Sequence, residues 1–566
     1  MKNRRKAREL SLQVLYQADV RKIAPTQVLK TILSRYHFKP GVESFSRNLI
    51  LGIEKFLPWI NTLIKRYAKN WTLDRMAVID RNILRISIYE LLLVKKVPPV
   101  VSINEAVEIA KRYGTEDSGK FVNGILDKIR KERVSEKPLK WNYFKQKLQN
   151  PFLKSFSELK KKTGGKAYLV GGFIRDSLLG KEARDFDIVL ESKDFEIVEK
   201  FAHQYGKHPV VLDDNLRRVI LPEGYQMDFS LQKASLESDL EERDFTIDAL
   251  ALDTNHIKIP NLYLIDIKGG LEDLCNHRIA LMNDNALDRD PLRMLRAIRL
   301  KLQLSFEIDR HLLDMIFEKH HLIDRVAKER IREEIFLILK NPAAGECLNQ
   351  PAFKKLMENA LKNPVYPENI QYLERIISPD TNLLHSVKSK LVKHLERRVG
   401  NVTHMQLLKL ISLIFSPFQK EGKEVKVEDL ALSKKEKRII GKVISSLPTL
   451  EKLTDKPSDS SKLSAFFLQG GEETPQICLL AVLARKEDAS YLSFMEEVLS
   501  IFFEKYSLIL QPPRLVSGNE LIDKLGIKPG PQLNIILNKI HQAQITGEVK
   551  KKDEALQLAR QLLEKT

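Results

Sequence analysis

The stretch "AYLVGGFIRDSLLGKEARDFDIVLE" (167–191) contains two apolar runs that are separated by a glycine pair and a helical segment. The second run is typical of a β-strand, on which Asp185 and Asp187 project from one face while Phe186 and Ile188 face the core. Two carboxylates this close repel each other by roughly 1–4 kcal/mol near a protein surface. Mg²⁺ would turn that repulsion into binding, because it takes one or two carboxylates and keeps positions for substrate phosphates.

The residues upstream favour a metal site over its alternative, an exposed strand whose aspartates pair with Lys181 or Arg184. Gly171 and Gly172 follow the first apolar run and begin a helical segment. Glycine lets the backbone approach a phosphate, and a helix start offers free N–H groups to it. Arg175, one turn into the helix, can reach the same anion. We interpret the stretch as a metal and nucleotide-phosphate site in an α+β domain.

These features, together with further motifs in the same order, resemble the class II nucleotidyltransferases of the DNA polymerase beta superfamily. That group comprises CCA-, CC- and A-adding tRNA nucleotidyltransferases and bacterial poly(A) polymerases. The resemblance covers about residues 165–345 and 515–565. The further motifs are "DLEERDFTIDALALD" (239–253), "LIDIKGGLEDL" (264–274), "RDPLRMLRAIRL" (289–300), "ERIREEIFLIL" (329–339) and the tail "LVSGNELIDKLGIKPGPQLNIILNKIHQAQITGEVKKKDEAL" (515–556).

The resemblance implies a template-independent transfer of C and/or A to the 3′ end of tRNA, with Mg²⁺ as cofactor and ATP and/or CTP as substrates. It assigns Asp185 and Asp187 as catalytic metal ligands and Asp228 as a third catalytic carboxylate, for which a capped strand end is the alternative. Asp290 and Arg293 are spaced i,i+3, which places them on one helix face if both are helical. The implied nucleotide-binding residues are Gly171, Gly172, Arg175, Arg243, Asp244, Asp290, Arg293 and Arg296.

Three positions depart from the pattern of that family. Arg289 stands where the base-reading motif usually has glutamate, Glu242 replaces the first of two arginines, and Asp248 replaces a common asparagine. None of these removes a metal ligand, so they bear on nucleotide preference rather than on activity. The chain has no His-Asp dipeptide, and we expect no phosphohydrolase activity of the kind that many relatives carry.

Positive charge is concentrated at the N-terminus. Residues 1–140 carry 29 Lys and Arg against 14 Asp and Glu, which is most of the net charge of +19. A basic domain of this kind indicates a nucleic-acid partner, because neutralising phosphates provides affinity without sequence specificity. Helical periodicity runs through this region, in "RRKARELSLQVLYQ" (4–17), "DRNILRISIYEL" (80–91), "VSINEAVEIAKRYG" (101–114) and "GKFVNGILDKI" (119–129).

These four N-terminal motifs resemble the NusB family of transcription antitermination factors over about residues 3–132. The resemblance implies an all-helical bundle that binds boxA RNA together with a small-subunit ribosomal protein of the antitermination complex. Exposed aromatic side chains can stack unpaired bases. The alternative to RNA binding is packing in the core for Phe121, and a solvated helix end for the arginines of residues 4–8. The implied RNA-binding residues are Arg4, Arg5, Arg8, Asp117 and Phe121.

We therefore expect a multidomain protein, in which an all-α bundle is followed by an α+β head of the polymerase-beta type and then by an all-α neck, body and tail. Three scattered cysteines without a CxxC pair predict neither a zinc site nor a disulfide framework. No apolar run is long enough to span a membrane, and we expect a cytoplasmic protein. The expected domains are the NusB-like domain (1–133), a linker (134–150), the head (151–280), the base-selecting neck (281–345) and an RNA- or tRNA-binding body and tail (346–566).

Two other functions stay open from the sequence. The same catalytic half could act as a poly(A) polymerase, although no basic "GRRF"-type element follows the acidic pair and the tail favours tRNA. Alternatively, the chain could be an antitermination factor whose nucleotidyltransferase half is inactive. The presence of both Asp185 and Asp187 argues against an inactive nucleotidyltransferase half.

Overall fold

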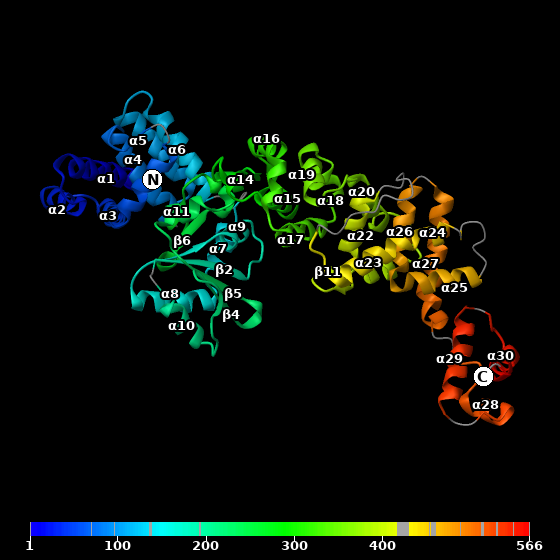
Figure 1. Cartoon of the computed structure of the whole chain (residues 1–566). Coiled ribbons are helices and arrows are strands. Elements are labelled where there is room, and N and C mark those ends of the chain that lie inside the picture. The colour runs from blue at the N-terminus through cyan, green and yellow to red at the C-terminus, as the bar shows by residue number, and fades with distance from the viewer. Residues whose placement is uncertain are drawn as a thin grey trace. The chain divides into compact units, whose positions relative to one another are not determined.

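The computed structural model forms two compact units, residues 1–286 and 287–566 (Figure 1). Among the described residues, no helix combines the length and the apolarity needed to cross a membrane. The structure describes the whole chain apart from residue 1 and residues 69–70, 95–96, 135–138, 192–193, 416–429, 452, 454–459, 487, 511–513, 528–529, 547 and 565–566.

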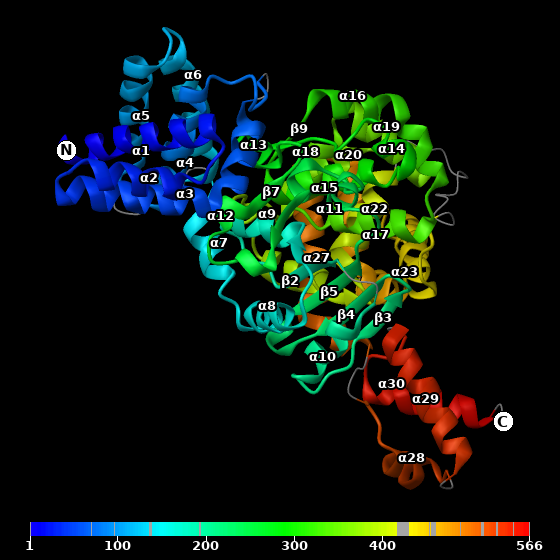
Figure 2. The same ribbon diagram turned by 90° about the vertical axis from the view of Figure 1, so that its left-hand side faces the viewer.

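The N-terminal part of the first unit is an all-helical bundle, drawn in blue in Figures 1 and 2. Its first helix packs against the third and the fourth, and the fifth packs between the fourth and the sixth. The fourth is buried over most of its length, and the fifth begins with a proline at its first position, where no N–H is needed. The helices are α1 (Lys2–Arg21), α2 (Pro25–Arg35), α3 (Pro40–Tyr67), α4 (Val78–Leu93), α5 (Pro99–Tyr113) and α6 (Ser118–Arg133).

The rest of the first unit is a head built on a seven-stranded sheet of order β3-β4-β5-β2-β1-β6-β7. β2 and β5 run parallel, and the other neighbours are antiparallel. The strands are β1 (Ala167–Val170), β2 (Asp185–Leu190), β3 (Val210–Asp213), β4 (Leu216–Ile220), β5 (Gln226–Leu231), β6 (Leu250–Asp253) and β7 (Leu264–Asp266). The helices are α7 (Trp141–Lys147), α8 (Pro151–Thr163), α9 (Gly172–Leu178), α10 (Glu196–His203), α11 (Leu236–Glu241), α12 (Pro260–Tyr263) and α13 (Gly270–Cys275).

Aromatic side chains cover one face of this sheet. Phe229 on β5 packs against Phe156 of α8 and Phe201 of α10, and Phe186 on β2 packs against Phe173 of α9. All five rings are almost fully buried. Since side chains alternate along a strand, residues 185 and 187 are left on the opposite face of β2. The head core therefore directs the acidic pair away from the aromatic layer.

A buried polar network joins the helical bundle to the head. Arg133, at the end of α6, is 1% exposed. Its guanidinium donates to the Tyr67 hydroxyl at 2.9 Å, to the Asn261 carbonyl at 2.9 Å and to the Leu264 carbonyl at 3.3 Å. Asp266 also forms a salt bridge with Arg66 of α3. Because buried charges and carbonyls need partners, this contact fixes the bundle to the edge of the head sheet.

The segment that we expected to be a linker, 134–150, contains the helix α7. Its Trp141 and Phe144 are buried, and the Trp141 indole N–H donates to the Glu132 carbonyl at 2.7 Å. Two large aromatic side chains need burial, so the segment packs against α9 instead of remaining extended.

Replacing Arg133 with alanine should lower the free energy of unfolding of the first unit by roughly 3 kcal/mol, because buried carbonyls lose their donor. Arg130→Ala, on the same helix, is the matched control, since Arg130 pairs with Asp127 at the surface and should change little. Denaturant unfolding and hydrogen exchange of α6 and β7 provide the measurement. If Arg133→Ala and Arg130→Ala had the same free energy of unfolding, a fixed contact between the bundle and the head would be contradicted.

In its described residues, the second unit is helical apart from the strand β9 (Glu307–Ile308) and a short hairpin, β10 (Arg398–Val399) and β11 (Val402–Thr403). The short helix α14 (Ala286–Arg289) spans the boundary between the two units in the sequence. Its core includes α26, which is buried on all sides, and its last three helices share an apolar cluster of their own. The predicted order of helical bundle, α+β head and helical remainder is confirmed. The helices are α15 (Arg293–Leu304), α16 (Arg310–Lys319), α17 (Lys328–Leu339), α18 (Ala344–Leu348), α19 (Pro351–Leu361), α20 (Pro367–Ile377), α21 (Lys388–Leu395), α22 (His404–Ile414), α23 (Lys434–Ser445), α24 (Leu447–Glu451), α25 (Ser460–Gly470), α26 (Thr474–Ala484), α27 (Ala489–Leu510), α28 (Gly518–Leu525), α29 (Pro531–Thr546) and α30 (Lys552–Glu564).

Candidate functional site

The acidic pair lies on β2, next to a third aspartate on β5. Asp185 begins the strand and is exposed, and Asp187 is partly exposed. The parallel register places Asp187 directly opposite Asp228. All three carboxylates therefore lie on the face of the sheet opposite the aromatic layer.

Asp228 is held by an arginine from the neighbouring strand. The Arg218 Nε and Nη2 atoms donate to its two carboxylate oxygens, each at 2.7 Å. Among the described residues, the three carboxylates are not brought within 4.8 Å of one another. Sequence reasoning did not single out Arg218, and only its cross-strand position opposite Asp228 reveals it. Of these three described carboxylates, Asp185 and Asp187 are therefore the two that no side-chain hydrogen bond holds in place.

Gly171 lies against Asp187, and any larger residue here would strain the backbone and displace the neighbouring side chains. Its φ is +77°, a left-handed conformation that glycine adopts readily. A Cβ atom at this position would lie 2.9 Å from the Asp187 Oδ2 atom and 2.6 Å from the Arg243 Nη1 atom. The turn after β1 therefore brings bare backbone, one carboxylate and one guanidinium together.

The surroundings of Asp187, and burial above all, work against the ionisation of its carboxyl group. Burial raises the pKa of the Asp187 carboxyl, and the like charges of Asp228 and Asp185 raise it further, while Arg243 acts in the opposite direction. A divalent cation would relieve this repulsion. The donor set also fits Mg²⁺, which prefers carboxylate oxygens and retains waters or phosphates at its other positions.

Arg175 is held one turn into α9 by two carboxylates. Its Nε donates to the Asp176 Oδ1 atom at 2.8 Å and its Nη1 to the Asp248 Oδ1 atom at 2.5 Å. Burial alone would lower the pKa of Arg175, but Asp248 and Asp176 raise it above the ordinary value for arginine. The aspartate at 248, noted above as a departure from the family pattern, thus neutralises part of the charge of Arg175. Asp244 follows Arg243 and is partly exposed.

The expected base-reading residues belong to the second unit. Asp290 precedes α15 and is not part of the helix, so the predicted i,i+3 pair on a single helix face is wrong. Its carboxylate accepts from the Leu292 N–H at 3.3 Å and from the Arg330 Nη2 atom at 2.9 Å. Arg293, the first residue of α15, is buried. Arg296 pairs with Glu334 of α17 at 3.3 Å.

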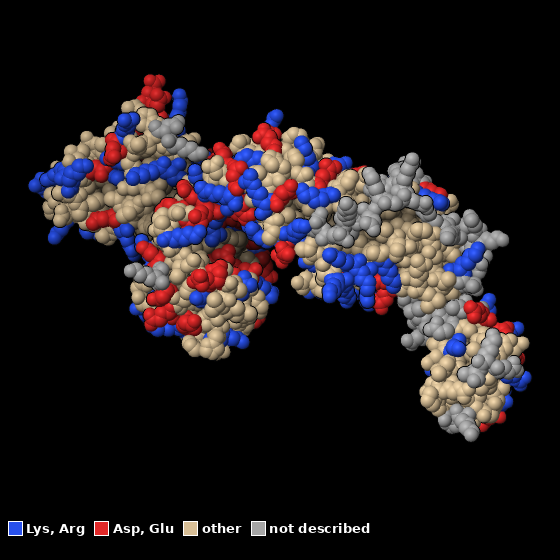
Figure 3. Space-filling view, viewed as in Figure 1, with Lys and Arg blue, Asp and Glu red and all other residues tan. Residues whose placement is uncertain are grey.

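The arginines of α1 have different environments, in a part of the bundle where Lys and Arg side chains are frequent (Figure 3). Arg4 is exposed and lies 5.6 Å from the Phe45 ring centroid. Arg5 is half exposed and forms a salt bridge with Glu105 at 2.6 Å. Arg8, by contrast, is 3% exposed and binds Glu90. The prediction that Arg8 contacts RNA does not fit this burial. Arg4 and Arg8 are four residues apart and lie on the same face of α1, and both guanidinium groups lie over the Phe45 ring. Arg8 lies one turn further along α1, where it pairs with the buried Glu90.

A second part of the expected RNA surface lies at the start of α6. Asp117 is exposed, and its carboxylate lies 4.0 Å from the Lys120 ammonium. Phe121 is partly exposed and contacts Trp71 edge to face, with ring centroids 6.0 Å apart. Trp71 is 51% exposed and was missed by sequence reasoning, since nothing in its local sequence places it beside Phe121.

Four family descriptions match the chain. "NusB family" matches residues 5–131, and "Poly A polymerase head domain" matches residues 167–231 and 221–280. "Probable RNA and SrmB- binding site of polymerase A" matches residues 305–369, and "tRNA nucleotidyltransferase domain 2 putative" matches residues 421–559.

Curated relatives and solved structures agree with these matches. The CC-adding tRNA nucleotidyltransferase of Synechocystis sp. is 31% identical over 406 residues, which are 70% of this chain and 93% of that protein. The transcription antitermination protein NusB of Desulforapulum autotrophicum is 45% identical over 132 residues, or 23% of this chain and 92% of that protein. The fold is shared with a Thermotoga maritima CCA-adding enzyme complexed with tRNA, at a TM-score of 0.52 and 24% identity over 77% of this chain and 98% of that chain. A CCA-adding enzyme in complex with ATP has a TM-score of 0.55 and 21% identity over 78% of this chain and 97% of that chain. The chain therefore belongs to the NusB family in its N-terminal helical bundle and to the tRNA nucleotidyltransferase family in its head and much of its helical remainder.

Proposed function

We propose that this chain adds C and/or A, with C favoured, to the 3′ end of tRNA in a Mg²⁺-dependent reaction. The observation that carries the proposal is the acidic pair beside Gly171 and Arg243. The preference for C is supported by the relative named CC-adding, which this chain matches over 93% of its length. In the proposed reaction, the tRNA 3′-hydroxyl oxygen attacks the α-phosphorus of the nucleotide. The bond to the bridging oxygen breaks, and pyrophosphate leaves.

The proposed roles follow from charge and position. Asp185 and Asp187 would hold Mg²⁺, which supplies Lewis-acid stabilisation of the phosphate charge. Arg243 and Arg175 would bind the triphosphate, which Gly171 and Gly172 allow to approach the backbone. Asp228, which was expected to be a third catalytic carboxylate, would instead be a positioning residue, because both of its carboxylate oxygens accept from Arg218. Asp290 and Arg293 would address the base, because a carboxylate accepts hydrogen bonds and a guanidinium donates them.

Three RNA substrates test this proposal and separate the subtypes. The full chain is incubated with Mg²⁺, labelled CTP or ATP, and tRNAs that end before CCA, after CC, or with complete CCA. We expect C incorporation into the first tRNA. Adenosine incorporation after CC would identify CCA or A addition. Long adenosine tails on any RNA would instead identify a poly(A) polymerase, and no incorporation into any of the three would overturn the enzymatic proposal.

Changing Asp248 to asparagine, the common family residue, should lower the KM for the nucleotide about 2- to 5-fold. One negative charge next to Arg175 is removed, and a partly exposed ion pair of this kind contributes ~0.5–1 kcal/mol. Glu182→Gln is the control, since Glu182 pairs with Arg184 at the surface. An unchanged or higher KM in Asp248→Asn would show that the charge of Arg175 does not serve the triphosphate.

We also propose that the N-terminal bundle binds boxA-type RNA, together with a small-subunit ribosomal protein. Support comes from the 45% identity to a NusB protein, from the exposed residues Arg4, Arg5 and Asp117, and from the partly exposed Phe121, with Trp71 beside it.

In the second unit, α23 carries four exposed basic residues over its buried Ile439 and Ile440, and blue atoms gather around it in Figure 3. We propose this face as a contact to tRNA phosphates. Its residues are Lys434, Lys435, Lys437 and Arg438.

A further inference from the structure

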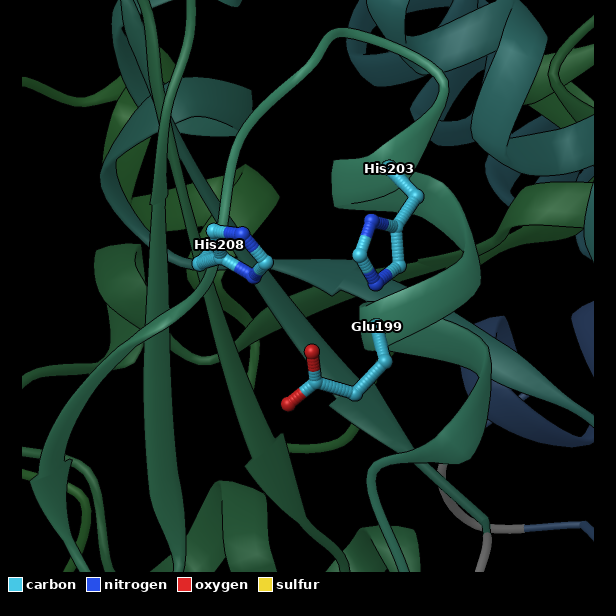
Figure 4. A group of neighbouring side chains, drawn as sticks. All are labelled: Glu199, His203 and His208. Atoms are coloured by element: carbon cyan, nitrogen blue, oxygen red, sulfur yellow. The ribbon is translucent and has the colours of Figure 1, made fainter.

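Glu199, His203 and His208 converge on the surface of the head, on α10 and the segment that leads from it into β3. One ligand atom from each of the three lies within 4.8 Å of the others. Figure 4 shows the side chains of Glu199 and His203 on one side of α10, directed toward His208 across the turn. No part of the proposed reaction uses these residues.

Local structure explains why they meet. Glu199 and His203 are four residues apart on a helix and so lie one above the other. Gly206, with a φ of +64°, ends the helix in a left-handed turn. Backbone bonds from the Gly206 N–H to the His203 carbonyl and from the Lys207 N–H to the Ala202 carbonyl, both at 3.1 Å, fold the chain back. This turn carries His208 to the face on which Glu199 and His203 already lie.

The three side chains have few competing contacts. Their two rings are 5.1 Å apart in an edge-to-face arrangement. Among the residues that the structure describes, no ion pair or side-chain hydrogen bond engages Glu199, His203 or His208. The neighbouring Lys200 pairs with Glu196 instead, at 2.6 Å. All three are exposed, so small rotamer changes can move their ligand atoms at little cost.

The geometry points to a site for a zinc-class divalent ion, bound by Glu199, His203 and His208, with the fourth position open to water. Zinc takes His nitrogen and Glu oxygen ligands at about 2.0–2.1 Å in a tetrahedron, which requires ligand atoms roughly 3.3 Å apart. The three ligand atoms already lie within 4.8 Å of one another, and all three side chains are exposed, so they can approach this spacing by rotation of the side chains. Two imidazoles select Zn²⁺, Co²⁺ or Ni²⁺ over Mg²⁺, which prefers oxygen. The expectation of no zinc site considered cysteines only, and this histidine site revises it.

A metal ion bound here would link α10 to the segment that leads into β3. β3 is an edge strand whose residues are exposed, and it pairs only with β4 in the described sheet. An ion that binds the folded head but not the unfolded chain stabilises the head by mass action. The inference does not depend on the proposed transfer reaction, because it concerns a separate set of ligands.

Cobalt binding to the full chain tests the site. The tag-free, metal-stripped protein is titrated with Co²⁺ in excess Mg²⁺, followed by the absorption of tetrahedral Co²⁺ and by competition with Zn²⁺. We expect one tetrahedral Co²⁺ per chain, and an affinity at least ~10-fold lower in His203→Ala and Glu199→Gln. Zinc should also slow hydrogen exchange around residues 199–213 in the wild type but not in His203→Ala.

Two controls separate this site from others. His385→Ala removes an exposed histidine elsewhere and should bind Co²⁺ as the wild type does. Asp185→Asn should also retain the tetrahedral site, which excludes the carboxylate pair as its origin. Nucleotide incorporation by His203→Ala should match the wild type. Absence of a tetrahedral spectrum in the wild type, or equal affinity in the wild type and His203→Ala, would overturn the inference.

Discussion

Replacing Asp187 with asparagine should lower the rate of nucleotide incorporation by at least ~10³-fold, which corresponds to about 4 kcal/mol of lost transition-state stabilisation. The carboxylate is one of two that would hold Mg²⁺, and asparagine keeps the shape but not the charge. Single-turnover incorporation of labelled CTP at saturating Mg²⁺ is the measurement. Asp213→Asn, on the exposed edge strand, is the matched control and should retain full activity.

The same variant should not be less stable than the wild type in the absence of metal. Burial and neighbouring carboxylates raise the pKa of Asp187. A raised carboxyl pKa means that ionisation at neutral pH costs the folded state free energy, and asparagine removes that cost. A thermal unfolding midpoint equal to or above that of the wild type, together with lost activity, would assign the defect to chemistry. Activity within 10-fold of the wild type would refute the role of Asp187.

Replacing Arg8 with alanine should destabilise the N-terminal bundle by about 3–5 kcal/mol, because it leaves a buried glutamate without its partner. The Arg8 Nε and Nη2 atoms donate to the Glu90 carboxylate at 2.8–3.0 Å, and the Ser102 hydroxyl donates to the same carboxylate at 2.8 Å. Glu90 is 1% exposed. Hydrogen exchange of α1, α4 and α5 in the full chain provides the measurement.

Arg5→Ala is the matched control for this second prediction. Arg5 lies on the same helix and also pairs with a glutamate, Glu105, but its side chain is 47% exposed. Exposed pairs contribute little, so exchange in α4 and α5 should remain near that of the wild type. RNA affinity separates the roles further, since Arg5→Ala should weaken boxA binding without unfolding. Equal protection in the two variants would contradict the structural role of Arg8.

The acidic pair shows what local sequence can predict. Alternation along a strand placed Phe186 in the core and Asp187 on the other face, and the structure agrees. The arginine cluster shows where prediction fails. Arg5 and Arg8 look alike in sequence and are neighbours on α1. Arg8 pairs with the buried Glu90, whereas Arg5 pairs with Glu105 and remains half exposed. Likewise, the predicted helical pairing of Asp290 with Arg293 failed because α15 begins only at residue 293.

The sequence by itself determined the order of helical bundle, α+β head and helical remainder, because periodicity and glycine motifs act over a few residues. It also identified both families from short motifs. Only the tertiary structure decided which charges are paired. Arg218 meets Asp228 across two adjacent strands of the sheet, and Arg133 meets Asn261 and Leu264, which lie 128 and 131 residues further along the chain. His208 joins Glu199 and His203 only because the turn at Gly206 folds the chain back, a geometry that spacing alone does not specify.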